Sequence, residues 1–175
     1  WVAAIRRSYR WPMQSPRWLP RALCRAERSR NMKKRTGTPW KPAGEYSKEL
    51  GGLTVNLLVR DMPKAIAFAR EVLQASIVYE DPDFAALEAQ GSKWCLHSDH
   101  TYNDHPLSGS LAETEVRGVG AELRVMGLDP DAAEGRARAA GYTVLAGSLD
   151  KAHGMREAYI LDADGYLWVP SVTPR

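Results

Sequence analysis

Histidine and aspartate side chains gather in one short stretch, LHSDHTYNDH, where imidazoles and carboxylates alternate: His97, Asp99, His100, Asp104 and His105. These groups are the ligands that zinc and iron sites use, so the stretch raises the question of a metalloenzyme. Its spacing matches no standard metal motif. We expect loop histidines that are solvated or that border a cavity, and a native metal site is the alternative.

A second set of chemically capable residues follows in the C-terminal half. His153 stands in the predicted loop DKAHGMREAY, and an imidazole with its ordinary pKa of about 6.5 suits acid/base catalysis at neutral pH. Glu122 and Arg124 alternate on one predicted strand. They either pair structurally or form a site in which Arg124 meets an acidic group and Glu122 accepts protons. We take His153 and Glu122 as candidate catalytic residues, with an ordinary exposed loop histidine as the alternative for His153.

The composition narrows the classes of protein. At 175 residues and 44% hydrophobic, the chain can form one domain, or two small halves that share a core. No apolar run approaches the roughly 20 residues of a membrane helix, so we expect no membrane partner. Cys24 and Cys95 form no CxxC pair, which excludes a disulfide scaffold and favours a cytoplasmic protein. The P-loop, GxSxG, HExxH and GxGxxG motifs are absent.

Charge divides the chain into a basic arm and an acidic body. Residues 1–41 hold 12 Lys or Arg and one acid, whereas residues 42–175 hold 12 Lys or Arg and 20 acids. Prolines interrupt the arm and it lacks apolar periodicity, so we expect it to be mostly disordered, with Met32 as the natural start. A body with a formal charge of −8 disfavours nucleic acid, and binding of nucleic acid through the arm is the rival hypothesis.

The body contains an internal repeat. LTVNLLVRDMPKAIAFAREVL and AELRVMGLDPDAAEGRARAAG each begin with a strand-like alternation and continue as a helix. Asp61 and Asp129 can cap these helices, and Gly141 is placed to end the second. Three strand candidates follow each helix: SIVYE, DFAALEA and KWCLH, then YTVLAG, REAYIL and YLWVP, the last two joined by the turn DADG. Each half therefore predicts the order β-α-β-β-β.

The segments NLLVRDMPKAIAFAREVL and HGMREAYILDADGYLWV resemble the vicinal oxygen chelate superfamily, the fold of glyoxalase, bleomycin resistance protein and extradiol dioxygenase. The resemblance covers about residues 50–172. It implies an α+β fold of two βαβββ modules, at about 50–100 and 117–172, that form a curved mixed sheet around a shared cavity. It also implies a homodimer.

The same resemblance implies where a metal would be held. The superfamily's His, Gln or Glu ligands correspond to Thr54, Gly120 and Val169, and to a fourth position near Leu96 or His97. Threonine offers only a neutral hydroxyl, and glycine and valine offer no side-chain donor. We therefore expect no metal and no other cofactor.

Strand alternation predicts which side chains face the cavity. If Leu53, Val55, Leu57 and Val59 pack beneath the helices, then Thr54, Asn56 and Leu58 face the other way, as do Gly120, Glu122 and Arg124 in the repeat. Three aromatic residues, Trp94, Tyr159 and Trp168, could line the ligand cavity or belong to the core. The candidate substrate-binding residues are Asn56, His97, Arg124, Tyr159 and Trp168.

These patterns favour a metal-free protein that binds a small organic molecule in a cavity, as a homodimer. An enzyme of the same fold is the alternative. It would use displaced metal ligands, as a lyase or dioxygenase, or metal-free acid/base catalysis through His153 or Glu122.

Overall fold

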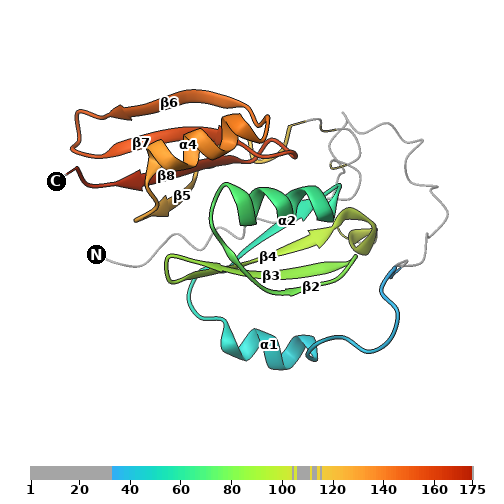
Figure 1. Ribbon diagram of the computed structural model, residues 1–175. Helices are drawn as coiled ribbons and strands as arrows, with labels where there is room; N and C mark the ends of the chain where they lie inside the picture. The colour runs from blue at the N-terminus through green and yellow to red at the C-terminus, as the bar shows by residue number, and fades with distance from the viewer. Residues whose placement is uncertain (1–32, 104, 106–110, 112–113, 115, 175) are drawn as a thin grey trace, which may run out of the picture.

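The computed structural model describes residues 33–103, 105, 111, 114 and 116–174; the predicted arm up to residue 32 and Asp104 lie outside them. Module 1 has the predicted order of one strand, one helix and three strands (Figure 1). Its elements are β1 (Val55–Val59), α2 (Met62–Glu71), β2 (Ser76–Glu80), β3 (Phe84–Ala89) and β4 (Ser92–Ser98), and they are followed by the 3-10 helix η2 (Asp99–Tyr102).

Module 2 repeats this order, which confirms the predicted α+β fold of two βαβββ units. Its elements are β5 (Leu123–Met126), α4 (Pro130–Ala139), β6 (Val144–Asp150), β7 (Arg156–Leu161) and β8 (Leu167–Val172). Sheet 1 has the strand order β1-β4-β3-β2, and sheet 2 has the equivalent order β5-β8-β7-β6. In each sheet the first and last strands of the module pair in parallel and the other neighbours pair antiparallel.

Local sequence explains both helices. The Asp61 carboxylate accepts a hydrogen bond from the Lys64 amide at the start of α2, and Asp129 accepts from the Asp131 amide at the start of α4. Each cap satisfies an amide that has no partner within its own helix. Gly141 follows α4 with a φ of +79°, as its predicted role requires.

The modules pack through the faces that carry their helices. Phe68 of α2 contacts the rings of Tyr142 and Trp168 of module 2, and Trp94 of sheet 1 contacts Trp168. One apolar core runs through both modules. Because the helix-bearing faces pack together, only the opposite face of each sheet is available to bind a ligand. β1 and β5 are edge strands of two separate sheets.

The prediction that Leu53 packs beneath the helices is wrong. The residue is 92% exposed because β1 begins only at Val55, after a bend at Gly52 and Leu53. Leu57 and Val59 are buried in the core as predicted.

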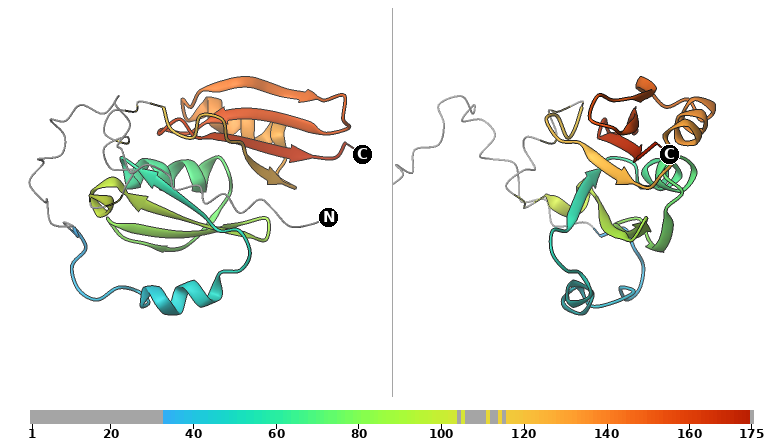
Figure 2. Two further views of the ribbon diagram at one scale, coloured as in Figure 1. Left: turned by 180° about the vertical axis from the view of Figure 1, so that it is seen from behind. Right: turned by 90° about the vertical axis from the view of Figure 1, so that its left-hand side faces the viewer.

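A further element precedes module 1. The helix α1 (Ala43–Glu49) lies on the side of sheet 1 opposite α2 (Figures 1 and 2). We call residues 33–50 the N-terminal strap. Within the described residues, no helix has the length and hydropathy needed to span a membrane. The boundary that we place at residue 41 stays a prediction.

Candidate functional site

A cavity of about 590 Å³ lies between the strap and the strap-facing side of sheet 1. Its floor is built by strand register: Asn56 of β1 pairs with Cys95 of β4, and His97 of β4 pairs with Phe84 of β3. Alternation directs these four side chains away from the helix-bearing core. The prediction that Thr54 and Asn56 face a cavity agrees with this arrangement, since both line it together with His97.

The strap supplies the roof. The ring of Trp40 stacks on Tyr79 with centroids 5.2 Å apart and planes 8° apart. Tyr46 of α1 meets Phe84 edge-on at 5.9 Å, and its hydroxyl lies 3.8 Å from the Cys95 sulfur. Aromatic rings from two parts of the sequence therefore border the cavity.

A buried carboxylate holds the strap in place. Asp83 is 4% exposed and accepts hydrogen bonds from the backbone amides of Lys34, at 2.8 Å, and Arg35, at 3.3 Å. His100 lies 2.8 Å from the same carboxylate. Burial alone would raise the pKa of Asp83, but the hydrogen bonds from His100 and the two amides outweigh it and lower that pKa. Asp83 thus remains ionised as an anchor.

The polar groups in the floor are neutral. Burial lowers the pKa of His97, whose ring lies between Phe84 at 4.9 Å and Tyr102 at 5.2 Å. The Asn56 amide donates a 2.6 Å hydrogen bond to the Tyr102 hydroxyl. The floor can therefore offer hydrogen bonds without placing a net charge against a ligand.

The equivalent face of sheet 2 has different chemistry. Glu157 of β7 is fully buried, and its carboxylate receives hydrogen bonds from Arg124 and from the Tyr159 hydroxyl at 2.7 Å. The His153 Nε2 atom lies 3.1 Å from the same carboxylate. Burial alone would raise the pKa of Glu157, but these three groups outweigh it and lower the pKa to about 2. We call these four residues the Glu157 cluster.

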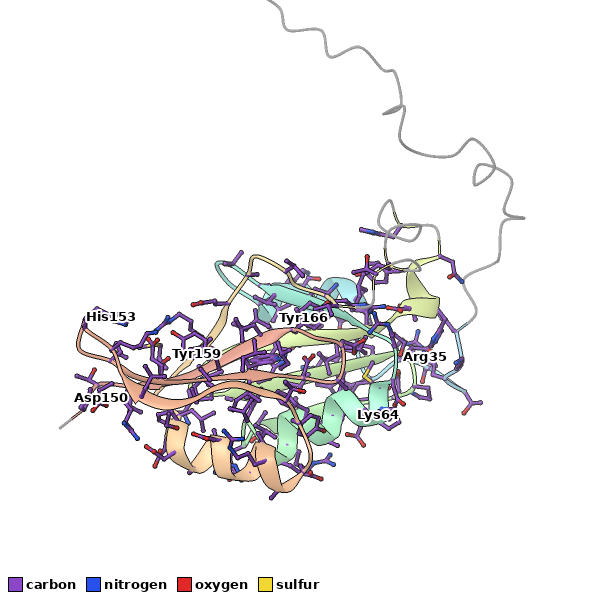
Figure 3. The ribbon with its side chains drawn as sticks, turned by 90° about the horizontal axis from the view of Figure 1, so that it is seen from above. Arg35, Lys64, Asp150, His153, Tyr159 and Tyr166 are labelled. Atoms are coloured by element: carbon purple, nitrogen blue, oxygen red, sulfur yellow. The ribbon has the colours of Figure 1, made fainter. Side chains whose placement is uncertain are left out.

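The cluster brings together three of the predicted site residues, Arg124, His153 and Tyr159, and Arg124 links it to a fourth, Glu122. Arg124 bridges Glu157 and Glu122, with a distance of 3.3 Å to Glu122. Figure 3 shows His153 of module 2 at the opposite end of that view from Arg35 of the strap, with Tyr159 between them and nearer to His153. Asn56 and His97 belong to the strap cavity instead. These six predicted residues therefore divide between two places, and their roles remain predictions.

Trp168 belongs to the contact between the modules. It is 6% exposed, packs against Phe68 and Trp94, and donates from Nε1 to Asp162 at 2.9 Å. This position agrees with the core alternative considered for it. It also lines a groove of about 290 Å³ beside β5.

The residues at the positions of the superfamily's metal ligands are not suited to bind a metal ion. Thr54 precedes β1, Gly120 precedes β5, and Val169 is buried in β8. Within the described part of the chain, no group of three or more His, Cys, Asp or Glu side chains is arranged to hold a metal.

The histidine-rich stretch is spread over separate contacts. His97 lines the cavity, His100 contacts Asp83, and His105 contacts the Tyr102 ring at 4.8 Å. Asp99 binds the buried Arg117 through two hydrogen bonds of 2.7 and 2.5 Å. The three histidines and Asp99 therefore make separate structural contacts and do not converge on one point.

Sequence reasoning missed Glu157 and the aromatic roof. The alternation of the strand 156–161 places Glu157 on the same face as Tyr159, so the signal was present. Trp40 and Tyr46 lie before the repeat, and no periodic pattern links them to sheet 1. Phe84 and Tyr102 stand beside His97 only through the register of β3 with β4 and through η2.

No protein-family model matches the chain, and no curated protein gives a significant match. Solved structures match in fold. A glyoxalase-related enzyme from Fulvimarina pelagi aligns with a TM-score of 0.58 at 19% identity, over 71% of this chain and 88% of that one. A glyoxalase/bleomycin resistance protein/dioxygenase family enzyme from Burkholderia phytofirmans PsJN has a TM-score of 0.58 at 20% identity, over 69% and 97%.

A third match is the fosfomycin resistance protein FosX from Listeria monocytogenes, with a TM-score of 0.54 at 18% identity, over 71% of this chain and 95% of that one. These likenesses agree with the two repeated modules and with the segments that first indicated the resemblance. The chain therefore has the fold of the glyoxalase, bleomycin resistance and dioxygenase proteins of the vicinal oxygen chelate superfamily.

Proposed function

We propose that this protein binds a small organic molecule in the strap cavity, without a metal ion or other cofactor. The observation that carries the proposal is a cavity of about 590 Å³ with aromatic walls and neutral hydrogen-bonding groups in its floor. Ligand sites of proteins are typically concave, mostly apolar and of about 300–1,000 Å³. Metal-free binding is supported by Thr54, Gly120 and Val169, which cannot supply the superfamily's ligand set.

A ligand screen tests this function. A library of small organic molecules is screened by ligand-observed NMR against the full chain and against Asn56→Leu/His97→Leu, which removes the polar floor. We expect ligands that bind the unchanged protein and are lost in this variant. The control is Arg124→Gln, which alters the other sheet and should retain them. No ligand for the unchanged protein, or ligands lost only in the control, would refute the proposal.

We further propose that two copies form a homodimer through the edge strands β1 and β5. The proposal is supported by apolar side chains exposed at or just before these edges: Leu53 at 92%, Val119 at 84% and Met126 at 52%. An edge strand with exposed apolar residues is a ready surface for pairing. Light scattering should give twice the chain mass of 19.5 kDa, and Leu53→Asp/Met126→Asp should give a monomer, unlike the control Val78→Asp. A monomeric unchanged protein would refute this proposal.

The Glu157 cluster supports a second candidate function, acid/base catalysis. A carboxylate that holds one imidazole nitrogen fixes the ring and leaves the other nitrogen for proton transfer. His153 is held in this way by Glu157, beside the cationic Arg124. Turnover of small carbonyl compounds that disappears in His153→Ala, with folding unchanged, would support catalysis. Turnover that survives in His153→Ala would exclude this role for His153.

We propose a cytoplasmic location. It is supported by Cys95, which is a free, buried thiol, as proteins of reducing compartments commonly contain. We propose neither a nucleic acid nor a membrane as a partner.

A further inference from the structure

We propose that the ligand of the strap cavity is a flat aromatic molecule that carries an acidic group. This inference rests on the proposed binding function and specifies the ligand by its chemistry. It follows from the ring geometry of the cavity, from the charges at its mouth and from the hydrogen-bonding groups in its floor.

The ring geometry favours a flat ligand. Trp40 and Tyr79 stack with planes 8° apart, so each ring covers part of one face of the other, and the Lys41 ammonium lies 4.5 Å from the Trp40 ring centroid. Tyr46 meets Phe84 at 76°, and Phe84 meets His97 at 62°. A planar ring can therefore stack on one member of the cavity wall while its edge meets another, which is how aromatic groups prefer to pack.

The charges around the cavity favour an anion. Three cationic side chains line it, Lys33, Arg35 and Lys41, against the single carboxylate of Asp83. Asp83 is occupied by the strap amides and His100. Two of the cations have partners outside the lining: Lys41 lies 2.6 Å from Glu49, and Arg35 lies 3.8 Å from Asp81.

Lys33 pairs with no carboxylate among the residues that the structure describes, and its side chain is exposed. An aromatic cage can also hold an organic cation. That alternative would place the cation near the unpaired Lys33, and among the described residues the cavity lining holds no carboxylate other than the occupied Asp83. The electrostatics therefore select an acid over an amine.

Hydrogen-bonding groups in the floor of the cavity can orient the ligand. The Asn56 amide and Tyr102 hydroxyl are joined by a hydrogen bond of 2.6 Å and both line the cavity. A hydroxyl that accepts this bond can still donate its own proton, and the amide nitrogen has a second proton. Both groups can thus donate to a carbonyl or acidic oxygen of a ligand that reaches the floor.

The experiment compares three probes of the same ring and different charge: 2-naphthoate, 2-naphthylmethanol and 2-naphthylmethylammonium. Their affinities for the full chain are measured by equilibrium dialysis at low ionic strength. We expect 2-naphthoate to bind about tenfold more tightly than the ammonium compound, because Lys33 has no carboxylate partner whereas Asp83 is already occupied. Trp40→Leu should weaken all three probes, since it removes one ring of the aromatic wall.

A second experiment removes the cationic side chains to which we attribute the preference for the acid. Lys33→Gln/Arg35→Gln should bring the acid and the amine to within about threefold of each other. The matched control, Lys64→Gln/Arg70→Gln, removes the same formal charge from α2, where Figure 3 shows Lys64, and should keep the preference. Arg124→Gln should also keep it, because Arg124 lies on sheet 2.

The outcomes separate the two proposals. Equal or tighter binding of the ammonium compound, with loss in Trp40→Leu, would overturn the ligand class and leave the cavity as a binding site. Binding of 2-naphthoate that is lost in Arg124→Gln and kept in Trp40→Leu would place the anion site on sheet 2 and overturn the inference. Failure of all three probes to bind would count against both the inference and the binding function.

Discussion

The two modules have the same order of elements, but the sheet faces that point away from the shared core carry different kinds of side chain. In sheet 1, Asn56 stands beside Cys95, and the face is aromatic, neutral and covered by the strap. In sheet 2, the equivalent pair is Arg124 beside Val169, and the face carries the charged Glu157 cluster. The helix-bearing faces share one apolar core. The shared core therefore restricts the residues on one face of each repeat, whereas the residues on the other face can differ between the repeats and serve separate functions.

The shared core should give the largest effect on stability. Phe68 is 1% exposed and contacts Tyr142 and Trp168 across the module boundary. Phe68→Ala should lower the free energy of unfolding by about 3–5 kcal/mol, since it leaves a cavity between the modules. Urea denaturation measures this, with the exposed Val78→Ala as the control. A loss below about 1 kcal/mol would show that the modules do not depend on this contact.

The charged face should give a smaller effect. Glu157→Gln keeps the shape of the side chain and removes its charge, which leaves Arg124 and His153 without their shared carboxylate. We expect a loss of about 1–3 kcal/mol in the free energy of unfolding. The matched change in module 1, Glu88→Gln, breaks the exposed pair with Lys93 and should cost about 0–1 kcal/mol. Equal losses would contradict the contrast between the faces.

The same carboxylate predicts a dependence on pH. Its pKa is lowered from 4.5 to about 2 in the folded protein, so the unfolded chain binds a proton more readily. The stability contributed by Glu157 is therefore complete above its unfolded pKa and is lost as pH falls from 4.5 towards 2. Urea denaturation across this range should show a steeper decline in the unchanged protein than in Glu157→Gln. Parallel declines would mean that the cluster does not hold the carboxylate ionised.

A backbone change should give the smallest effect. Gln74 follows α2 with a φ of +56°, in the left-handed region, and its side chain is exposed. Gln74→Gly should raise the free energy of unfolding by about 0.5–1 kcal/mol, because glycine adopts this conformation without a steric cost. Thermal denaturation measures the gain. A decrease in the midpoint would show that the side chain contributes more than the backbone conformation costs.

Most of the fold could be predicted from sequence because each repeat carries local signals. Asp61 and Asp129 cap their helices, and the DADG turn joins β7 to β8. The limits lie at the ends of elements: the alternation that began at Leu53 extends two residues beyond the start of β1. Two glycines precede Leu53, and their freedom of conformation ends the strand pattern there.

The site could be predicted only in part. Alternation placed Asn56 correctly relative to the core, because the period of a strand is a local property. The strap could not be placed, since Trp40 meets Tyr79 and the Lys34 amide meets Asp83 across 39 and 49 positions of sequence. Contacts of this range depend on tertiary packing and have no periodic signal. The Glu157 cluster likewise joins β5, β7 and the loop that carries His153.

The central claim is that the strap-covered face of module 1, and not the charged face of module 2, binds the ligand. The most direct measurement is a crystal structure of the full chain with 2-naphthoate. We expect a naphthalene ring against Trp40 and Phe84, with its carboxylate within hydrogen-bond reach of Asn56 or Tyr102 or directed to Lys33. A ring bound on sheet 2, with its carboxylate on Arg124 and the strap cavity unchanged, would contradict it.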